Sequence, residues 1–264
     1  MKVIIGTDLE GVAGVVSFEN QAYADAKYYE QAKKLLTAEI NAAVDGLVES
    51  GVEEILVVDG HGPGAVSFED LHPKAKLMHG RPFPPLNVRR ELIKEFDVCM
   101  MLGQHAMAGV KLGTLNHTQA SSSIDYYKLN GELVGEIAQY ALEKGALGLP
   151  MIFLCGDDAA CEEASALIPE ITTTSVKRGV GRNSAISVSA TEAHRLIKEG
   201  VVAAVKKHKE TPRRPLTLPG PYVLEKRFFH THVADMMENH PLVERVDSQT
   251  IRIKSDDILD VIYA

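Results

Sequence analysis

The sequence has few cysteines and no pair of them in a metal-binding or redox motif. Its 264 residues include only Cys99, Cys155 and Cys161, and these form no C-x-x-C pair. Two of the three lie inside apolar runs, where a cysteine is usually a buried structural thiol. Free thiols of this kind predict a reducing, cytoplasmic environment.

An excess of basic charge is also lacking. The chain has 28 Lys and Arg against 36 Asp and Glu, a formal net charge of -8, and no long basic run. Nucleic acid and anionic membranes are therefore not expected as partners, and a small neutral or cationic ligand fits better. Too few apolar residues precede Asp8 for a signal peptide or a membrane span, so neither is expected.

Short apolar, β-branched segments alternate with amphipathic ones along most of the chain. Strands are expected over residues 3–5, 54–59, 97–103, 151–155 and 172–176, and helices over 28–50 and 191–208. Strands that alternate with helices indicate a parallel sheet with right-handed crossovers. The sequence therefore predicts an α/β fold of three layers, with a mostly parallel sheet and crossover helices.

The remaining segments predict a smaller part at the C-terminus. A strand over 121–129, an Asn130-Gly131 turn and a helix over 132–142 precede it. Four prolines between Thr211 and Pro221 indicate an extended connection, followed by expected strands over 222–229 and 243–253 and a helix over 256–262. We expect a catalytic α/β domain over 1–210 and an α+β part over 211–264, packed on or between subunits.

Polar side chains follow the expected strands where each strand ends. Asp8 and Glu10 follow the first strand, His61 the second and His105 the third. The carboxyl ends of parallel strands share one edge of a sheet, so these side chains are expected to converge. Carboxylates this close repel each other unless a cation lies between them. The alternative to a cation site at Asp8 and Glu10 is that the first strand ends in a polar turn in which Glu10 is solvated.

Two further residues complete a possible dinuclear metal site. Adding His117 and Glu136 gives three carboxylates and three imidazoles, a set that suits two ions of zinc, manganese or cobalt. The alternative for each histidine is an ordinary loop residue bonded to nearby backbone. Asp59 could orient His61 or could cap its own loop, and Asp157 and Asp158 are expected to cap the helix that follows them.

These residues also lie in motifs that resemble the zinc-dependent D-aminopeptidase family. The resemblance covers nearly the whole chain and is weakest beyond about residue 211. Its motifs are Asp8-Leu-Glu10-Gly, Asp59-Gly-His61, Leu102-Gly-Gln-His105-Ala, Asn116-His117-Thr118, Val134-Gly-Glu136 and Gly156-Asp157-Asp158, with Ile168-Pro169 and Thr172-Thr-Thr174 after them.

The resemblance implies a role for each matching residue. It implies that Asp8 bridges two zinc ions, that Glu10, His61, His105 and Glu136 complete their coordination, and that His117 is catalytic. It also implies a ring-based homo-oligomer, because the family's type member is a decamer that encloses its active sites.

The expected function is metal-dependent removal of N-terminal residues from short peptides or aminoacyl amides, by water activated between two metal ions and with a D-amino-acid preference. An L-specific aminopeptidase or amidase on the same site is the first alternative. A different metal hydrolase, such as a phosphoesterase, is the second, although only Arg178 and Arg182 could form a phosphate site. A dipeptide-binding protein without metals is the third.

Overall fold

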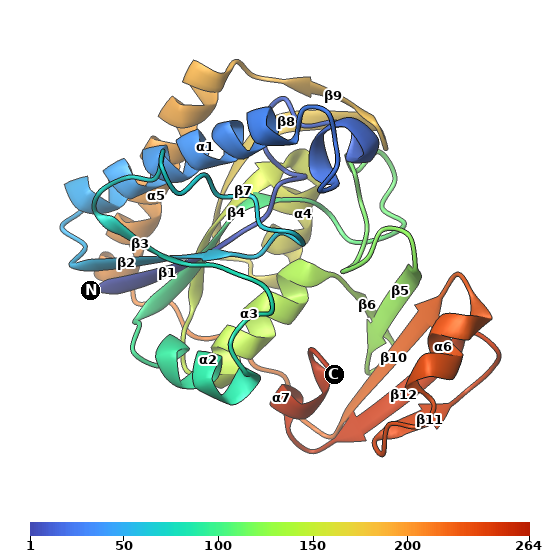
Figure 1. The fold of residues 1–264 in the computed structure, drawn as a ribbon. Coiled ribbons are helices and arrows are strands. Elements are labelled where there is room, and N and C mark those ends of the chain that lie inside the picture. The colour runs from blue at the N-terminus through green and yellow to red at the C-terminus, as the bar shows by residue number, and fades with distance from the viewer.

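A seven-stranded sheet forms the centre of the molecule in the computed structural model, which describes all 264 residues (Figure 1). Six strands are parallel and the edge strand β9 is antiparallel to β8. Their order is β3-β2-β1-β4-β7-β8-β9. The bounds are β1 Lys2–Thr7, β2 Glu54–Asp59, β3 Ala75–Met78, β4 Val98–Gln104, β7 Met151–Asp157, β8 Thr172–Gly181 and β9 Ser184–Ser187.

Helices cover both faces of this sheet. The helices α1 (Tyr29–Glu49) and α5 (Ala190–Glu210) pack together on one face, and α3 (Glu136–Ala146) and α4 (Asp158–Leu167) on the other. Successive strand residues point to opposite faces, so Val3 and Ile5 join the core under α1 and α5, whereas Ile4 joins the core under α3. The three-layer α/β prediction is confirmed.

A second, antiparallel sheet lies beside the first (Figure 1). Its order is β11-β12-β10-β5-β6, and α6 (Thr231–Met237) and α7 (Ile258–Val261) accompany it. The bounds are β5 Ile124–Leu129, β6 Glu132–Val134, β10 Tyr222–Phe228, β11 Val243–Arg245 and β12 Thr250–Ser255. The C-terminal strands therefore share a sheet with residues 124–134, while the division of the chain into domains at residue 211 stays a prediction.

Two expected elements differ from the structure. The helix expected over 132–142 begins only at Glu136, because Glu132–Val134 pairs with β5 and Gly135 then separates strand from helix. The strand expected over 243–253 is instead the hairpin of β11 and β12. The sequence also gave no indication of β3, of α2 (Leu86–Ile93), or of the single π-helical turn η1 (Phe18–Ala22).

Helix α3 is the main contact between the two sheets. It follows β6 directly, and midway along it Gln139 Nε2 donates to the Ile262 carbonyl of the α7 region at 2.8 Å. Near its end, a Cβ added at Gly145 would lie 1.8 Å from the Leu216 carbonyl oxygen, so only glycine fits there. None of the helices combines the length and apolar composition needed to cross a membrane.

Candidate metal centre

Three neighbouring strands bring polar side chains to one edge of the central sheet. Asp8 follows β1, His61 follows β2 and His105 follows β4, and the register of these strands aligns their ends. The chain after β1 lies tightly against β4, with the Asp8 amide donating to Leu102 at 2.8 Å. A Cβ at Gly11 would lie 2.0 Å from the Gln104 carbonyl oxygen, so glycine is required for this approach.

Asp8 lies at the centre of the cluster, between two imidazoles. One of its oxygens is 3.1 Å from His61 Nδ1 and the other is 3.1 Å from His105 Nε2. Glu10 and Glu136 complete the arrangement on either side, since Glu10 Oε2 is 3.1 Å from His61 Nδ1 and Glu136 Oε1 is 3.5 Å from His105 Nε2. Both oxygens of Asp8 are therefore engaged, each with a different imidazole.

The backbone fixes the orientation of all three imidazoles. Each ring donates one N–H to a main-chain oxygen: His61 Nε2 to Ala22 at 2.8 Å, His105 Nδ1 to Ala106 at 2.9 Å and His117 Nδ1 to Leu115 at 2.9 Å. The second nitrogen of each ring then faces the carboxylates. Metal-bound histidines have this arrangement, in which a hydrogen bond at one nitrogen leaves the lone pair of the other for the ion.

His117 lies within the cluster. Its ring stacks on that of His105 at 4.0 Å between centroids and 15° between planes, and its Nε2 is 3.8 Å from Glu136 Oε1. The bond to the Leu115 carbonyl is the one expected of an ordinary loop histidine. The other nitrogen nevertheless faces the carboxylates, so the position allows a chemical role in addition.

Charge pairing inside the cluster outweighs the effect of burial. Burial raises the pKa of Asp8, but the adjacent imidazoles of His105 and His61 hold that pKa well below its usual range. Burial likewise lowers the pKa values of His61 and His105, yet the adjacent carboxylates raise both well above the ordinary value. The pKa of His117 is lowered by burial and by the positive charge of His105. Without a cation, protons on two imidazoles therefore compensate the carboxylates.

The donor set fits bound metal ions. Glu10 Oε2 and His105 Nε2 are buried, and their ion-pair partners at 3.1 Å lack the geometry of a hydrogen bond, which is costly unless a bound cation engages these atoms. Two groups have ligand atoms within 4.8 Å of one another: Asp8, Glu10 and His105, and His105, His117 and Glu136. Imidazole nitrogens with carboxylate oxygens are ligands that zinc accepts.

Two cations that the sequence did not suggest, one buried and one exposed, stabilise the loops of this site. Lys177, on β8, donates to the carbonyls of Glu10 and Val15, and burial lowers the pKa of its amine to about 8. Arg81 donates to the carbonyls of Asp59, His61 and Gly62 from a segment beyond β3.

Of the acidic residues considered as caps, Asp59 and Asp157 have that role, whereas Asp158 is the first residue of α4 and accepts from the Gly179 amide. Asp59 accepts from the amides of Ala65 and Val66 at 2.9 and 3.2 Å, so it caps its loop and does not orient His61. Asp157 is the N-cap of α4, where it accepts from Ala160. Its other oxygen accepts from the Thr114 amide at 2.8 Å, which ties the His117 loop to the sheet.

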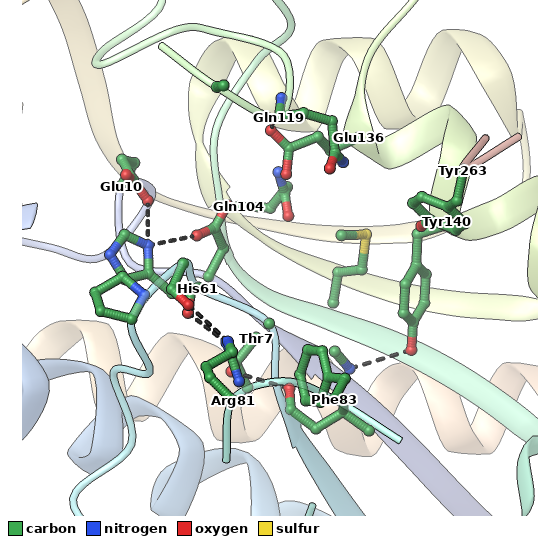
Figure 2. A pocket seen from close by; sticks show the side chains of 18 of the residues that line it. Thr7, Glu10, His61, Arg81, Phe83, Gln104, Gln119, Glu136, Tyr140 and Tyr263 are labelled. Atoms are coloured by element: carbon green, nitrogen blue, oxygen red, sulfur yellow. Dashed lines mark hydrogen bonds and ion pairs between the residues drawn. The ribbon is translucent and has the colours of Figure 1, made fainter. Parts of the chain in front are cut away.

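A cavity of about 770 Å³ opens from the cluster. Figure 2 shows Glu10, His61 and Gln104 on one side of it and Tyr140 and Tyr263 on the other. A small molecule can therefore lie against the metal-type ligands within a partly enclosed space.

Comparison with known proteins identifies the family. The family model of D-aminopeptidases matches residues 1–264. The chain belongs to the D-aminopeptidase family. This confirms the resemblance seen in the sequence motifs and shows a hydrolase of the aminopeptidase class.

A sequence comparison and a structure comparison of this D-aminopeptidase family member each give a match over the whole chain. A D-aminopeptidase of Bacillus subtilis (strain 168) is 29% identical over 268 residues, which include 100% of this chain and 95% of that protein. The solved structure of the zinc-dependent D-aminopeptidase DppA from Bacillus subtilis, described as a self-compartmentalizing protease, superposes with a TM-score of 0.91 at 28% identity, covering 100% of this chain and 94% of that one.

Proposed function

We propose that this aminopeptidase binds two divalent ions, zinc in the native protein, through Asp8, Glu10, His61, His105 and Glu136. The observation that supports this most directly is the position of Asp8, whose two oxygens each lie 3.1 Å from a different imidazole. A carboxylate in that position can bridge two ions. The zinc dependence of the structural relative supports zinc, and manganese or cobalt are the alternatives by ligand type.

The cations would supply a Lewis acid for the scissile carbonyl and lower the pKa of an attacking water. The chain itself contributes proton transfer and positioning. His117, whose pKa is lowered, is neutral near pH 7 and can accept a proton at Nε2 while Nδ1–H stays on the Leu115 carbonyl. It then donates that proton to the leaving amine. A free amine at the N-terminus of the substrate could pair with one of the carboxylates, which would select for an N-terminal residue.

The preferred substrates are short peptides or aminoacyl amides with a D-residue at the N-terminus, as the family name suggests. The self-compartmentalizing relative supports a homo-oligomer, and the resemblance in the sequence motifs suggests a decamer. The three cysteines are buried and free, which supports a cytoplasmic location. A phosphoesterase is disfavoured because neither Arg178 nor Arg182 lines the cavity, and Arg182 packs over the Phe18 ring.

The test is a panel of D- and L-aminoacyl nitroanilides and dipeptides with the protein reconstituted with zinc, manganese or cobalt. We expect hydrolysis of the D-series, about two ions per chain by elemental analysis, and loss of activity with a chelator. Faster cleavage of the L-series would identify the L-specific alternative. Activity that persists in a protein with only traces of metal would contradict the metal mechanism.

A further inference from the structure

The far end of the cavity differs in charge from the metal centre. It is formed by α2 and by the later turns of α3, beyond Tyr140. Its lining includes Arg89, Glu143, Lys144 and Tyr263, with Leu86 among the apolar residues of the wall.

Three cations surround a single carboxylate there. Glu143 Oε2 pairs with Lys144 Nζ at 2.5 Å, while Glu143 Oε1 is 3.5 Å from Arg90 Nε and 4.0 Å from an Arg89 nitrogen. Lys144 and Glu143 are almost fully buried, with side chains 6% and 1% exposed. Burial raises the pKa of Glu143, but Lys144 and the two arginines outweigh it and hold that pKa below its ordinary value. The ionised carboxylate therefore leaves an excess of two positive charges.

The hydrogen-bonding capacity of this cluster is not filled. Arg89 makes no hydrogen bond with its guanidinium, and the buried Nε atoms of Arg89 and Arg90 have no acceptor. Arg90 has another partner, because it donates to the Leu259 carbonyl at 2.6 Å and does not line the cavity. Arg89 does line it, and its only anionic neighbour, Glu143 at 4.0 Å, is too far to accept a hydrogen bond from its guanidinium.

The two ends of the cavity are separated by the length of a short peptide. Glu136 begins α3 and Lys144 lies eight residues later on the same helix, so their Cα atoms are about 12 Å apart at 1.5 Å per residue. An extended chain advances about 3.3–3.6 Å per residue, and the long side chains of Arg89 and Lys144 shorten the gap. Two or three residues therefore extend from one cluster to the other.

We propose that Arg89 and Lys144 bind the C-terminal carboxylate of a di- or tripeptide whose amino end lies at the metal centre. This subsite rests on the aminopeptidase function proposed above and defines its substrate class, which is short peptides with both termini free. Arg89 provides the planar fork that matches a carboxylate, and Lys144 provides a point charge. Tyr140 accepts from the Gly6 amide at 3.1 Å, which leaves its O–H free to donate to the peptide between the two ends.

The experiment compares D-alanyl-D-alanine with its C-terminal amide, using the metal-reconstituted full-length protein. The wild type is expected to have a kcat/KM about 10- to 100-fold higher for the acid, since a charge-assisted hydrogen bond contributes that much. Arg89→Met should reduce the acid-to-amide ratio to near one, and Arg89→Lys should restore part of it. Lys94→Met is the matched control, because Lys94 caps the same helix and pairs only with Glu91 on the surface.

Each outcome has a defined meaning. If the cluster only fastens α2 to α3, Arg89→Met lowers both rates alike and the ratio stays at the wild-type value, which overturns the subsite. A wild-type ratio near one also overturns it while leaving the aminopeptidase function intact. Calorimetry with the reduced-bond analogue of the dipeptide, as acid and as amide, distinguishes the two proposals. A protein that binds the acid analogue more tightly than the amide but does not hydrolyse D-alanyl-D-alanine would support the subsite and contradict the proposed function.

Discussion

The two ends of the cavity are both buried charge clusters, but their excess charge is opposite. At the edge of the sheet, Asp8, Glu10 and Glu136 face imidazoles that are neutral in their ordinary form. At the far end, Glu143 is outnumbered by cations. Buried charges are costly unless they are paired, so the charge left over within each cluster indicates the charge of its missing partner. One end requires cations and the other an anion.

The two clusters also differ in how firmly the backbone fixes them. The metal-type ligands follow strand ends, and each imidazole is fixed by a bond to a carbonyl. Arg89 and Lys144 are long side chains on helices and can adjust to a ligand. Substitutions at the metal centre should therefore abolish the site, whereas substitutions of Arg89 or Lys144 should change the substrate preference.

The largest effect is expected from Asp8→Ala. Removing the carboxylate that contacts both imidazoles should release both ions and lower turnover by about 10³-fold or more. Metal content and rate would be measured on the same preparation, with Asp25→Ala on an exposed loop as the control. A variant that retains two ions would show that Asp8 does not bridge them.

His117→Ala should separate catalysis from metal binding. We expect full metal content, a modest change in KM and turnover lowered by about 10²- to 10⁴-fold, the range for a proton-transfer group. His230→Ala, an exposed histidine, is the control. Near-normal turnover with full metal would remove the catalytic role, and loss of one ion would reassign His117 as a ligand.

Acidification should release the metal. In the metal-free site the pKa values of His61 and His105 are raised well above their ordinary value, so a cation must displace their protons. Below those pKa values, affinity should fall by about tenfold per pH unit for each proton displaced. Equilibrium dialysis over a pH series measures this. An affinity independent of pH would contradict binding through these imidazoles.

The smallest effect concerns a buried cation outside both clusters. Lys226 on β10 has no ion pair, and burial alone lowers its pKa to about 8. Below pH 8 both the folded and unfolded states bind this proton and the full cost of burying the charge is present. Lys226→Met should therefore raise the free energy of unfolding at pH 7 by about 1–3 kcal/mol.

The pH dependence of that difference provides a check. Between pH 8 and the unfolded value near 10.5, the folded protein loses the proton first, so wild-type stability rises with pH and the gain from Lys226→Met shrinks. Urea unfolding at several pH values measures it. A gain that stays constant from pH 7 to 10 would show that the Lys226 charge is not costly.

The convergence of Asp8, His61 and His105 was predictable because each follows a parallel strand, and such strand ends meet at one edge. The interruption at Gly135 was not, since residues 132–142 are compatible with a helix until β5 pairs with 132–134. Lys177 and Arg81 left no local pattern, because they reach the site from distant segments to bond main-chain oxygens. The position of Arg89 at the cavity depends on how α2 packs against α3, and the hydrophobic periodicity of the sequence does not specify that packing.

The attachments of α3 have a mechanical consequence. The helix is joined to the second sheet by β6 at its start, by Gln139 midway and by the Leu216 segment near its end. Ile137, Tyr140 and Ala141 of the same helix pack in the core of the central sheet, so α3 couples the two sheets at the position of Glu136. A force on the second sheet, from a fused domain or a neighbouring copy, would widen or narrow the gap between Asp8 and Glu136 and so alter how tightly the pair can hold ions.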